Sequence, residues 1–157
     1  MKLIEKDESL SFTTQDGTLV KLDGFWDMGL FFPDCTYLTC SAEWAYKEPD
    51  YERYPGVGYH QKVKEGTLTG LERRMARLEA DLHVKKLYHS DIPKVSIENP
   101  VGKLSSMFMK PSQVIQPYEF GDDASKKTCL WLKNIPLLEP TDYIVPAIVT
   151  GKLEKVS

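Results

Sequence analysis

The sequence predicts a single-domain α/β protein built on a β-sheet that contains a parallel strand–helix–strand unit. A long amphipathic pattern over residues 67–88 lies between two short apolar runs, residues 27–32 and 94–98. Two strands joined by a crossover helix lie parallel and form a right-handed unit. The 157 residues, 41% of them hydrophobic and 27% charged, suffice for one buried core without a disulfide or metal.

The first elements of the chain are expected to be β-strands. Segments 11–15 and 18–22 flank Asp16-Gly17, a typical hairpin turn, so residues 1–24 predict a β-rich lead-in. The run 27–32 is almost continuously apolar and stops at a proline, which is typical of a strand buried on both faces. Residues 47–66 are rich in proline, tyrosine and charge without periodicity, and predict an exposed loop.

The clearest element is a helix over about residues 67–88. Leucine and methionine recur every three or four residues, and we expect this stripe to face the core. The arginines Arg73, Arg74 and Arg77 then fall on a solvated face. The stripe consists of Leu68, Leu71, Met75, Leu78 and Leu82.

Shorter elements follow the helix. Strands are expected near residues 94–98, 113–118 and 127–132, with a short helix over 102–109. Three prolines between 136 and 146 predict an irregular end of the chain. We therefore divide the chain into a lead-in (1–24), an α/β domain (25–142) and an irregular tail (143–157).

Two of these strands end in candidate catalytic groups. Cys35 follows the run 27–32, and Glu98 ends the run 94–98. Ligands of such sheets bind beyond the carboxyl ends of the strands, so both side chains share one rim if the strands are neighbours. A thiolate and an acid so placed suit covalent attack on an electron-poor ring. The alternatives are a buried structural thiol for Cys35 and a helix or loop cap for Glu98.

Four short motifs occur in an order that resembles a known family. They are Pro33-Asp34-Cys35-Thr36-Tyr37-Leu38-Thr39, Glu98-Asn99-Pro100-Val101, Gln116-Pro117-Tyr118-Glu119-Phe120-Gly121 and Lys126-Lys127-Thr128-Cys129-Leu130-Trp131-Leu132. Together they resemble cytosine-5 DNA methyltransferase-like proteins of a small phage and bacterial subfamily. The resemblance implies a Rossmann-like methyltransferase sheet with crossover helices.

The resemblance also implies roles for individual residues. Cys35 would be the nucleophile on C6 of cytosine, and Glu98 would hold and protonate N3. S-adenosylmethionine would be the cofactor, and DNA or a nucleotide the partner. The residues expected to bind the substrate are Thr36, Asn99, Pro100, Lys126, Lys127 and Thr128.

Two departures from the family pattern limit these roles. The family has proline before the cysteine, whereas Asp34 stands here, and a neighbouring carboxylate opposes thiolate formation. Family members begin with a strand and a glycine-containing loop that hold the cofactor, and residues 1–24 contain no such unit. The sequence therefore predicts a sheet that is incomplete at the N-terminal cofactor-binding part. Another polypeptide could supply the missing half.

These features leave two classes of function open. One is a transferase-like protein that acts on or binds a cytosine or another pyrimidine base, with impaired cofactor binding. The alternative is a non-catalytic, phage-type protein whose degenerate fold binds nucleic acid, a nucleotide or a protein. The net charge of −3 gives no general basic footprint for DNA.

Composition also bears on metals and location. The spacing of Cys35 and Cys40 is wider than in a paired-cysteine zinc site, so we expect no metal. The charged start is unlike a secretory signal, and no apolar run approaches the ~20 residues of a membrane span. Three cysteines, an odd number, then predict free thiols and a cytoplasmic protein, in the host cell if it is phage-encoded.

Overall fold

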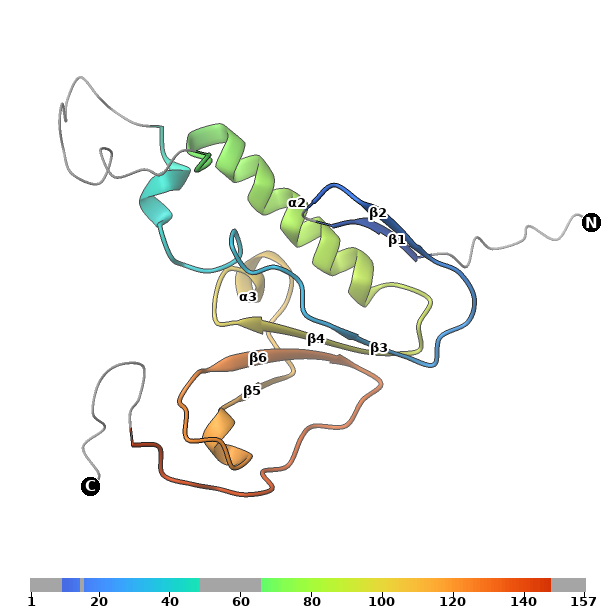
Figure 1. Cartoon of the computed structure of the whole chain (residues 1–157), viewed down its shortest axis with the longest axis vertical. Helices are drawn as coiled ribbons and strands as arrows, with labels where there is room; N and C mark the ends of the chain where they lie inside the picture. The colour runs from blue at the N-terminus through green and yellow to red at the C-terminus, as the bar shows by residue number, and fades with distance from the viewer. Residues whose placement is uncertain (1–9, 15, 49–65, 148–157) are drawn as a thin grey trace, which may run out of the picture.

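The computed structural model describes residues 10–14, 16–48 and 66–147, which form a hairpin, a four-stranded sheet and one long helix (Figure 1). The hairpin pairs β1 (Leu10–Thr13) with β2 (Leu19–Leu22), as the Asp16-Gly17 turn predicts. The sheet contains β3 (Met28–Phe31), β4 (Lys94–Pro100), β5 (Gln113–Ile115) and β6 (Thr128–Lys133). The helices are α2 (Gly70–Tyr88), the short α3 (Leu104–Met107) and the 3₁₀ turns η1 (Glu43–Tyr46) and η2 (Pro117–Glu119).

The strands of the sheet follow the order β3-β4-β6-β5. The pair β3–β4 is parallel and is joined through α2, which confirms the expected strand–helix–strand unit. The last two strands are connected without a crossover α-helix, and β6 runs antiparallel to both of its neighbours. The sheet is therefore mixed, with its two parallel strands at one side.

The core lies between α2 and one face of the sheet. Val95 and Ile97 of β4 point toward the helix and are fully buried, as is Trp131 of β6. Val84 and Leu87 of α2 pack against them. Burial of each such side chain stabilises the fold by roughly 1.5–3 kcal/mol. Alternation along β4 then puts Ser96, Glu98 and Pro100 on the opposite, half-buried face.

The predicted orientation of α2 is wrong. Leu71, Met75, Leu78 and Leu82 are 50–62% exposed, and the helix instead buries its other face. That face is lined by Gly70, Arg73, Asp81, Val84 and Leu87.

The buried face holds arginine because its guanidinium groups find partners, although Nε of Arg73 is buried without a hydrogen bond. Arg73 donates to the carbonyl oxygen of Leu68 and lies over the Tyr46 ring, 4.8 Å from its centroid. Arg77 donates to backbone carbonyls of the segment that follows β3. A periodic pattern identifies an apolar stripe but does not show what packs against it. The periodicity of α2 therefore predicts the wrong buried face.

The strand β3 is also less buried than its composition predicts. Gly29 faces α2 and is buried, but Met28 and Leu30 on the other face are 46% and 58% exposed. Phe32, just beyond the strand, is 73% exposed. In the described part of the sheet β3 is a terminal strand with one unpaired edge, and the exposure of Met28 and Leu30 shows that its second face is largely uncovered there as well. The apolar run thus has the composition of an internal strand at an edge position.

The two ends of the described chain pack on this framework. The hairpin lies beside α2, where Lys86 donates to the carbonyl oxygen of Ser11 and the rings of Phe12 and His83 stand 5.6 Å apart (Figure 1). Residues 134–147 contain no helix or strand, and residues 148–157 of the expected irregular tail lie outside the described residues. Most of the expected loop 47–66 lies outside the described residues.

None of the described helices has the length and apolar character required to cross a membrane.

Candidate active site at the carboxyl ends of β3 and β4

The neighbouring ends of two parallel strands place the candidate catalytic residues at one edge of the sheet. Phe31 of β3 pairs with Ile97 of β4, so the chain leaves β3 toward Cys35 beside Glu98. Glu98 lies within β4 rather than after it, because the strand continues to Pro100. We call Cys35, Thr36, Glu98, Asn99, Pro100, Lys126, Lys127 and Thr128 the strand-end site.

The two strand ends are joined by Asn99. Its side chain is 1% exposed, and its Nδ2 donates a hydrogen bond of 3.0 Å to the carbonyl oxygen of Pro33. The Oδ1 atom of Asn99 is buried without a hydrogen-bond partner. Burial of a side-chain amide is unfavourable unless the amide forms hydrogen bonds. The bond from Nδ2 satisfies part of this requirement and holds the two segments in a fixed relation. Asn99 therefore fixes the start of the Cys35 loop to β4.

A second contact joins the loops beyond the strand ends. Thr39 forms a β-bridge with Gly102, and the amide of Lys103 donates to the carbonyl oxygen of Leu38 at 2.7 Å. A Cβ atom on Gly102 would lie 2.2 Å from that same oxygen. Only glycine permits this approach, so the loop after β3 and the loop after β4 form one unit.

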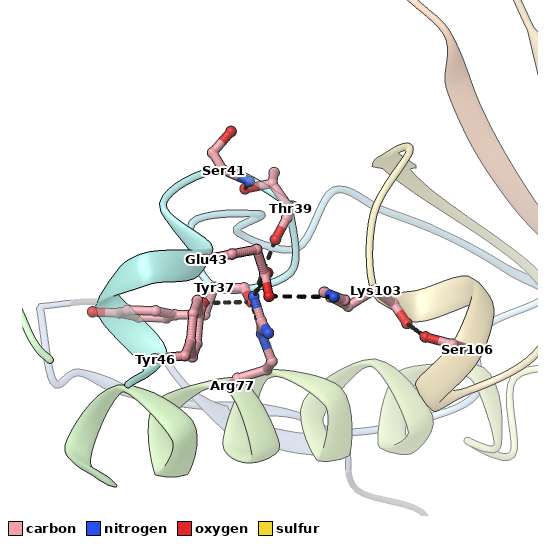
Figure 2. Close-up of polar contacts among 8 residues, drawn as sticks. All are labelled: Tyr37, Thr39, Ser41, Glu43, Tyr46, Arg77, Lys103 and Ser106. Atoms are coloured by element: carbon pink, nitrogen blue, oxygen red, sulfur yellow. Dashed lines mark hydrogen bonds and ion pairs between the residues drawn. The ribbon is translucent and has the colours of Figure 1, made fainter. Parts of the chain in front are cut away.

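Figure 2 shows how α2 holds the segment that follows Cys35. Arg77 Nε donates to the carbonyl oxygen of Tyr37 at 2.7 Å, and its Nη2 donates to that of Thr39 at 3.2 Å. The same Nη2 lies 2.7 Å from Glu43 Oε1, while Lys103 Nζ lies 3.3 Å from Glu43 Oε2. The hydrogen bond from Arg77, followed by the one from Lys103, lowers the pKa of Glu43. One guanidinium therefore ties the helix, η1 and the Cys35 loop together.

The loop itself is shaped by Asp34. Its Oδ1 accepts hydrogen bonds from the amide and the hydroxyl of Thr36, at 3.2 and 2.8 Å. The carbonyl oxygen of Cys35 accepts from the amides of Leu38 and Thr39, which closes the turn. The Thr36 hydroxyl, expected to bind substrate, thus donates within the loop. Cys35 is a half-buried free thiol at the start of this turn.

Glu98 faces the side of the sheet opposite to Asn99. It pairs in register with Leu130 of β6, and its half-buried carboxylate lies on the face that α2 does not cover. Burial raises the pKa of the neighbouring Cys129 thiol, and the charge of Glu98 adds to that effect. Cys129 is 1% exposed and belongs to the core, as its apolar surroundings in the sequence predict.

The third part of the strand-end site begins β6. Thr128 pairs with Pro100, so the last motif starts at the same end of the sheet as the Cys35 loop. Thr128 Oγ1 donates to the carbonyl oxygen of Lys126 at 3.1 Å, and both Lys126 and Lys127 are exposed. The backbone therefore brings the three predicted groups of residues to one rim and places two positive charges there.

The residues that hold this rim in place differ from those that the sequence predicts. The sequence pattern places Arg77 on a solvated face, but its side chain is only 12% exposed, and Gly102 and Glu43 are not among the predicted site residues. The glycine after Glu98-Asn99-Pro100-Val101 was the available signal, since glycine permits a close backbone approach. The partners of Arg77 come from segments more than 30 residues away, and no local pattern marks them.

The described residues contain no group of three or more His, Cys, Asp or Glu side chains arranged to hold a metal. Residues 10–14 and 16–22 form a hairpin, whereas the family resemblance places a cofactor-binding strand and loop ahead of the cysteine motif. Comparison with protein-family models, curated proteins and solved structures finds no match to this chain.

Proposed function

We propose that this chain is a relative of the cytosine-5 DNA methyltransferases that engages a cytosine or related pyrimidine base of nucleic acid at the strand-end site. The supporting observation is the hydrogen bond from Asn99 to Pro33, which ties the loop of Cys35 to the strand of Glu98. A site that orients one base requires such fixed positions, because misplacement by about 1 Å costs roughly a hundredfold in rate. The exposed Lys126 and Lys127 supply positive charge for a phosphate.

The proposed chemistry is nucleophilic addition to the base. The Cys35 thiolate would form a bond from Sγ to C6 of the pyrimidine. The electron pair of the C5–C6 double bond shifts through the ring, and N3 takes a proton from the carboxylic acid of Glu98. In a duplex the base would first have to leave the stack.

Methyl transfer would further require S-adenosylmethionine, and we propose that the chain binds this cofactor poorly. A hairpin occupies residues 10–14 and 16–22, so the strand and glycine-containing loop of the family are not formed there. The exposed apolar face of β3 and its edge, which no strand of the described residues pairs with, offer a surface on which a second polypeptide could complete the sheet. Calorimetric titration with S-adenosylmethionine tests this point, and stoichiometric micromolar binding by the chain alone would contradict it.

One observation favours a second candidate, a non-catalytic protein that binds nucleic acid, a nucleotide or a protein with the same fold. Asp34 directly precedes Cys35, and its carboxylate is held in the turn by the amide and hydroxyl of Thr36. The residue before the candidate nucleophile therefore departs from the family pattern, which has proline there, and its carboxylate is engaged within the turn. The free cysteines, Cys35, Cys40 and Cys129, support action in the cytoplasm, of the host if the protein is phage-encoded.

Covalent capture on an electrophilic base separates the two candidates. A single-stranded oligonucleotide with one 2-pyrimidinone base accepts a thiolate at C6 without any methyl donor, so the trap does not depend on the cofactor. The proposal expects an adduct, observed by intact-protein mass spectrometry, that Cys35→Ser abolishes. Cys40→Ser is the matched control, because Cys40 is an exposed thiol five residues away and should leave the adduct unchanged.

Binding of ordinary cytosine oligonucleotides, followed by fluorescence anisotropy, completes the test. Binding without an adduct, weakened by Glu98→Ala and retained in Cys35→Ser, supports the non-catalytic candidate. Absence of both binding and adduct contradicts the proposed function in either form.

A further inference from the structure

The exposed stripe of α2 is the strongest surface feature that the base-binding proposal does not use. It consists of Leu71, Met75, Leu78 and Leu82, each at least half exposed. Four large apolar side chains in one row on a helix are unusual on a free surface and mark an interaction site. We call this row the α2 stripe.

The spacing of the α2 stripe identifies its occupant as another helix. Its members follow one another at intervals of four, three and four residues, the a/d repeat of a coiled coil. The helix face that packs on the sheet, with Val84 and Leu87, lies on the opposite side of α2. The stripe is therefore directed away from the rest of the described fold, as a two-helix interface requires.

The charges beside the stripe identify that helix as α2 of a second copy in parallel orientation. Arg74 precedes Met75, and Glu79 follows Leu78, which are the g and e positions that flank such an interface. In a parallel pair each Arg74 faces Glu79 of the other copy, and a two-fold axis makes this contact twice. In an antiparallel pair Glu72 and Glu79 of the two copies would face one another and repel. Both glutamates are exposed. Arg74 Nη1 donates to the carbonyl oxygen of Tyr46 at 2.7 Å, and its Nη2 lies 3.4 Å from the exposed Glu48. The contact with Glu79 of the other copy would replace only the weak pair with Glu48.

We propose that the chain self-associates as a parallel dimer through the α2 stripe. The helix is already formed by its packing on the sheet, so association does not have to order it. The stripe covers about two heptads, which is at the small end for a specific interface, so the dimer is expected to be weak. The proposal does not depend on the strand-end site or on its ligand.

Sedimentation velocity across about 5 to 500 μM protein, the range in which small interfaces dissociate, tests the dimer. We expect the mass to rise from the 17.9 kDa monomer toward twice that value. Leu78→Glu should raise the dissociation constant at least about tenfold, since it buries a charge in the interface. Leu137→Glu is the matched control, because Leu137 is a comparably exposed leucine away from α2.

Thermal unfolding should show that both variants fold, since both positions are solvent-exposed in the monomer. If Leu78→Glu does not fold, Met75→Lys replaces it. A chain that stays monomeric throughout, because its stripe is free or covered by another part of the chain or by a different protein, overturns the proposal. Self-association that is unaffected by Leu78→Glu also overturns it.

Orientation is tested by disulfide capture in a Cys35→Ser, Cys40→Ser background. In a parallel dimer the two copies of position 78 face one another, so Leu78→Cys should cross-link with itself under mild oxidation. Failure to cross-link at concentrations where the dimer forms would contradict the parallel arrangement. A variant that loses dimerisation but still binds the base, or the reverse, would show that the dimer and the proposed function can be tested independently.

Discussion

The Asn99 side-chain amide donates a 3.0 Å hydrogen bond to the carbonyl oxygen of Pro33, across the ends of two parallel strands. The two residues are 66 positions apart, and Asn99 is almost completely buried. Through this contact β4 determines where the Cys35 loop begins. This hydrogen bond therefore connects the sheet to the arrangement of residues in the strand-end site.

Replacement of Asn99 with alanine is expected to loosen the Cys35 loop. The change removes one buried hydrogen bond and should lower the free energy of unfolding by about 1 kcal/mol, offset in part because an unpaired buried oxygen is also removed. We expect faster alkylation of Cys35 by iodoacetamide, measured by peptide mass spectrometry. Gln113→Ala is the control, because Gln113 also donates its side-chain amide to a carbonyl, that of Leu138, in another part of the fold. Equal Cys35 alkylation in wild type and Asn99→Ala would argue against this role.

Arg77 is expected to contribute more to stability than its neighbour Arg74. Arg77→Lys loses the planar group that reaches two carbonyls and Glu43, at a cost of about 1–3 kcal/mol in the free energy of unfolding. Arg74 donates to one carbonyl, that of Tyr46 at 2.7 Å, and lies 3.4 Å from the exposed Glu48, so Arg74→Lys should cost no more than about 1 kcal/mol. Urea unfolding of the two variants measures the difference. Equal effects would show that the contacts of Arg77 contribute no more than those of Arg74.

Glu43 gives the fold an expected acid sensitivity. Its folded pKa is lowered, first by the hydrogen bond from Arg77, below the ordinary value of 4.5. Its stabilising contribution is therefore complete above that value and is lost as pH falls through the lower folded pKa. Glu43→Gln should be less stable than wild type at pH 7, and the difference should shrink toward about pH 3. Denaturant unfolding at both pH values checks this, and a difference that grows on acidification would refute it.

The two faces of α2 should respond differently to truncation. Leu87 is 3% exposed and lies in the core, so Leu87→Ala should cost about 2–5 kcal/mol in the free energy of unfolding. Leu78→Ala, at a side chain that is 50% exposed, should cost under about 1 kcal/mol when measured in dilute, monomeric protein. A larger loss for Leu78→Ala than for Leu87→Ala would mean that α2 packs with its other face.

The sequence predicts the secondary-structure elements more accurately than it predicts which of their faces are buried. The Asp16-Gly17 hairpin, the helix and the parallel strands around it were all recognisable, because turn residues and hydrophobic spacing are local signals. The direction of α2 and the exposure of β3 were missed. Both depend on what packs against an apolar face, and a single stretch of sequence does not carry that information.

In the strand-end site too, local sequence signals indicate some residues, whereas contacts between distant segments determine others. Motif order indicated Cys35, Glu98 and Asn99, and adjacent pairing of β3 and β4 places them at one edge. The support from Arg77 was not predictable, because its partners lie 34–40 residues away and include backbone carbonyls. The sequence predicts a solvated Arg77, since composition does not show that carbonyl oxygens and a tyrosine ring surround its guanidinium group.

Base binding at the strand-end site can be observed through the backbone amide chemical shifts of ¹⁵N-labelled protein during titration with a short single-stranded cytosine oligonucleotide. We expect the largest changes on Cys35 and Thr36 and on Glu98 and Asn99, and smaller ones with an abasic oligonucleotide of equal length. Changes confined to residues remote from the ends of β3 and β4, or none at all, would contradict a base-binding site at this edge of the sheet.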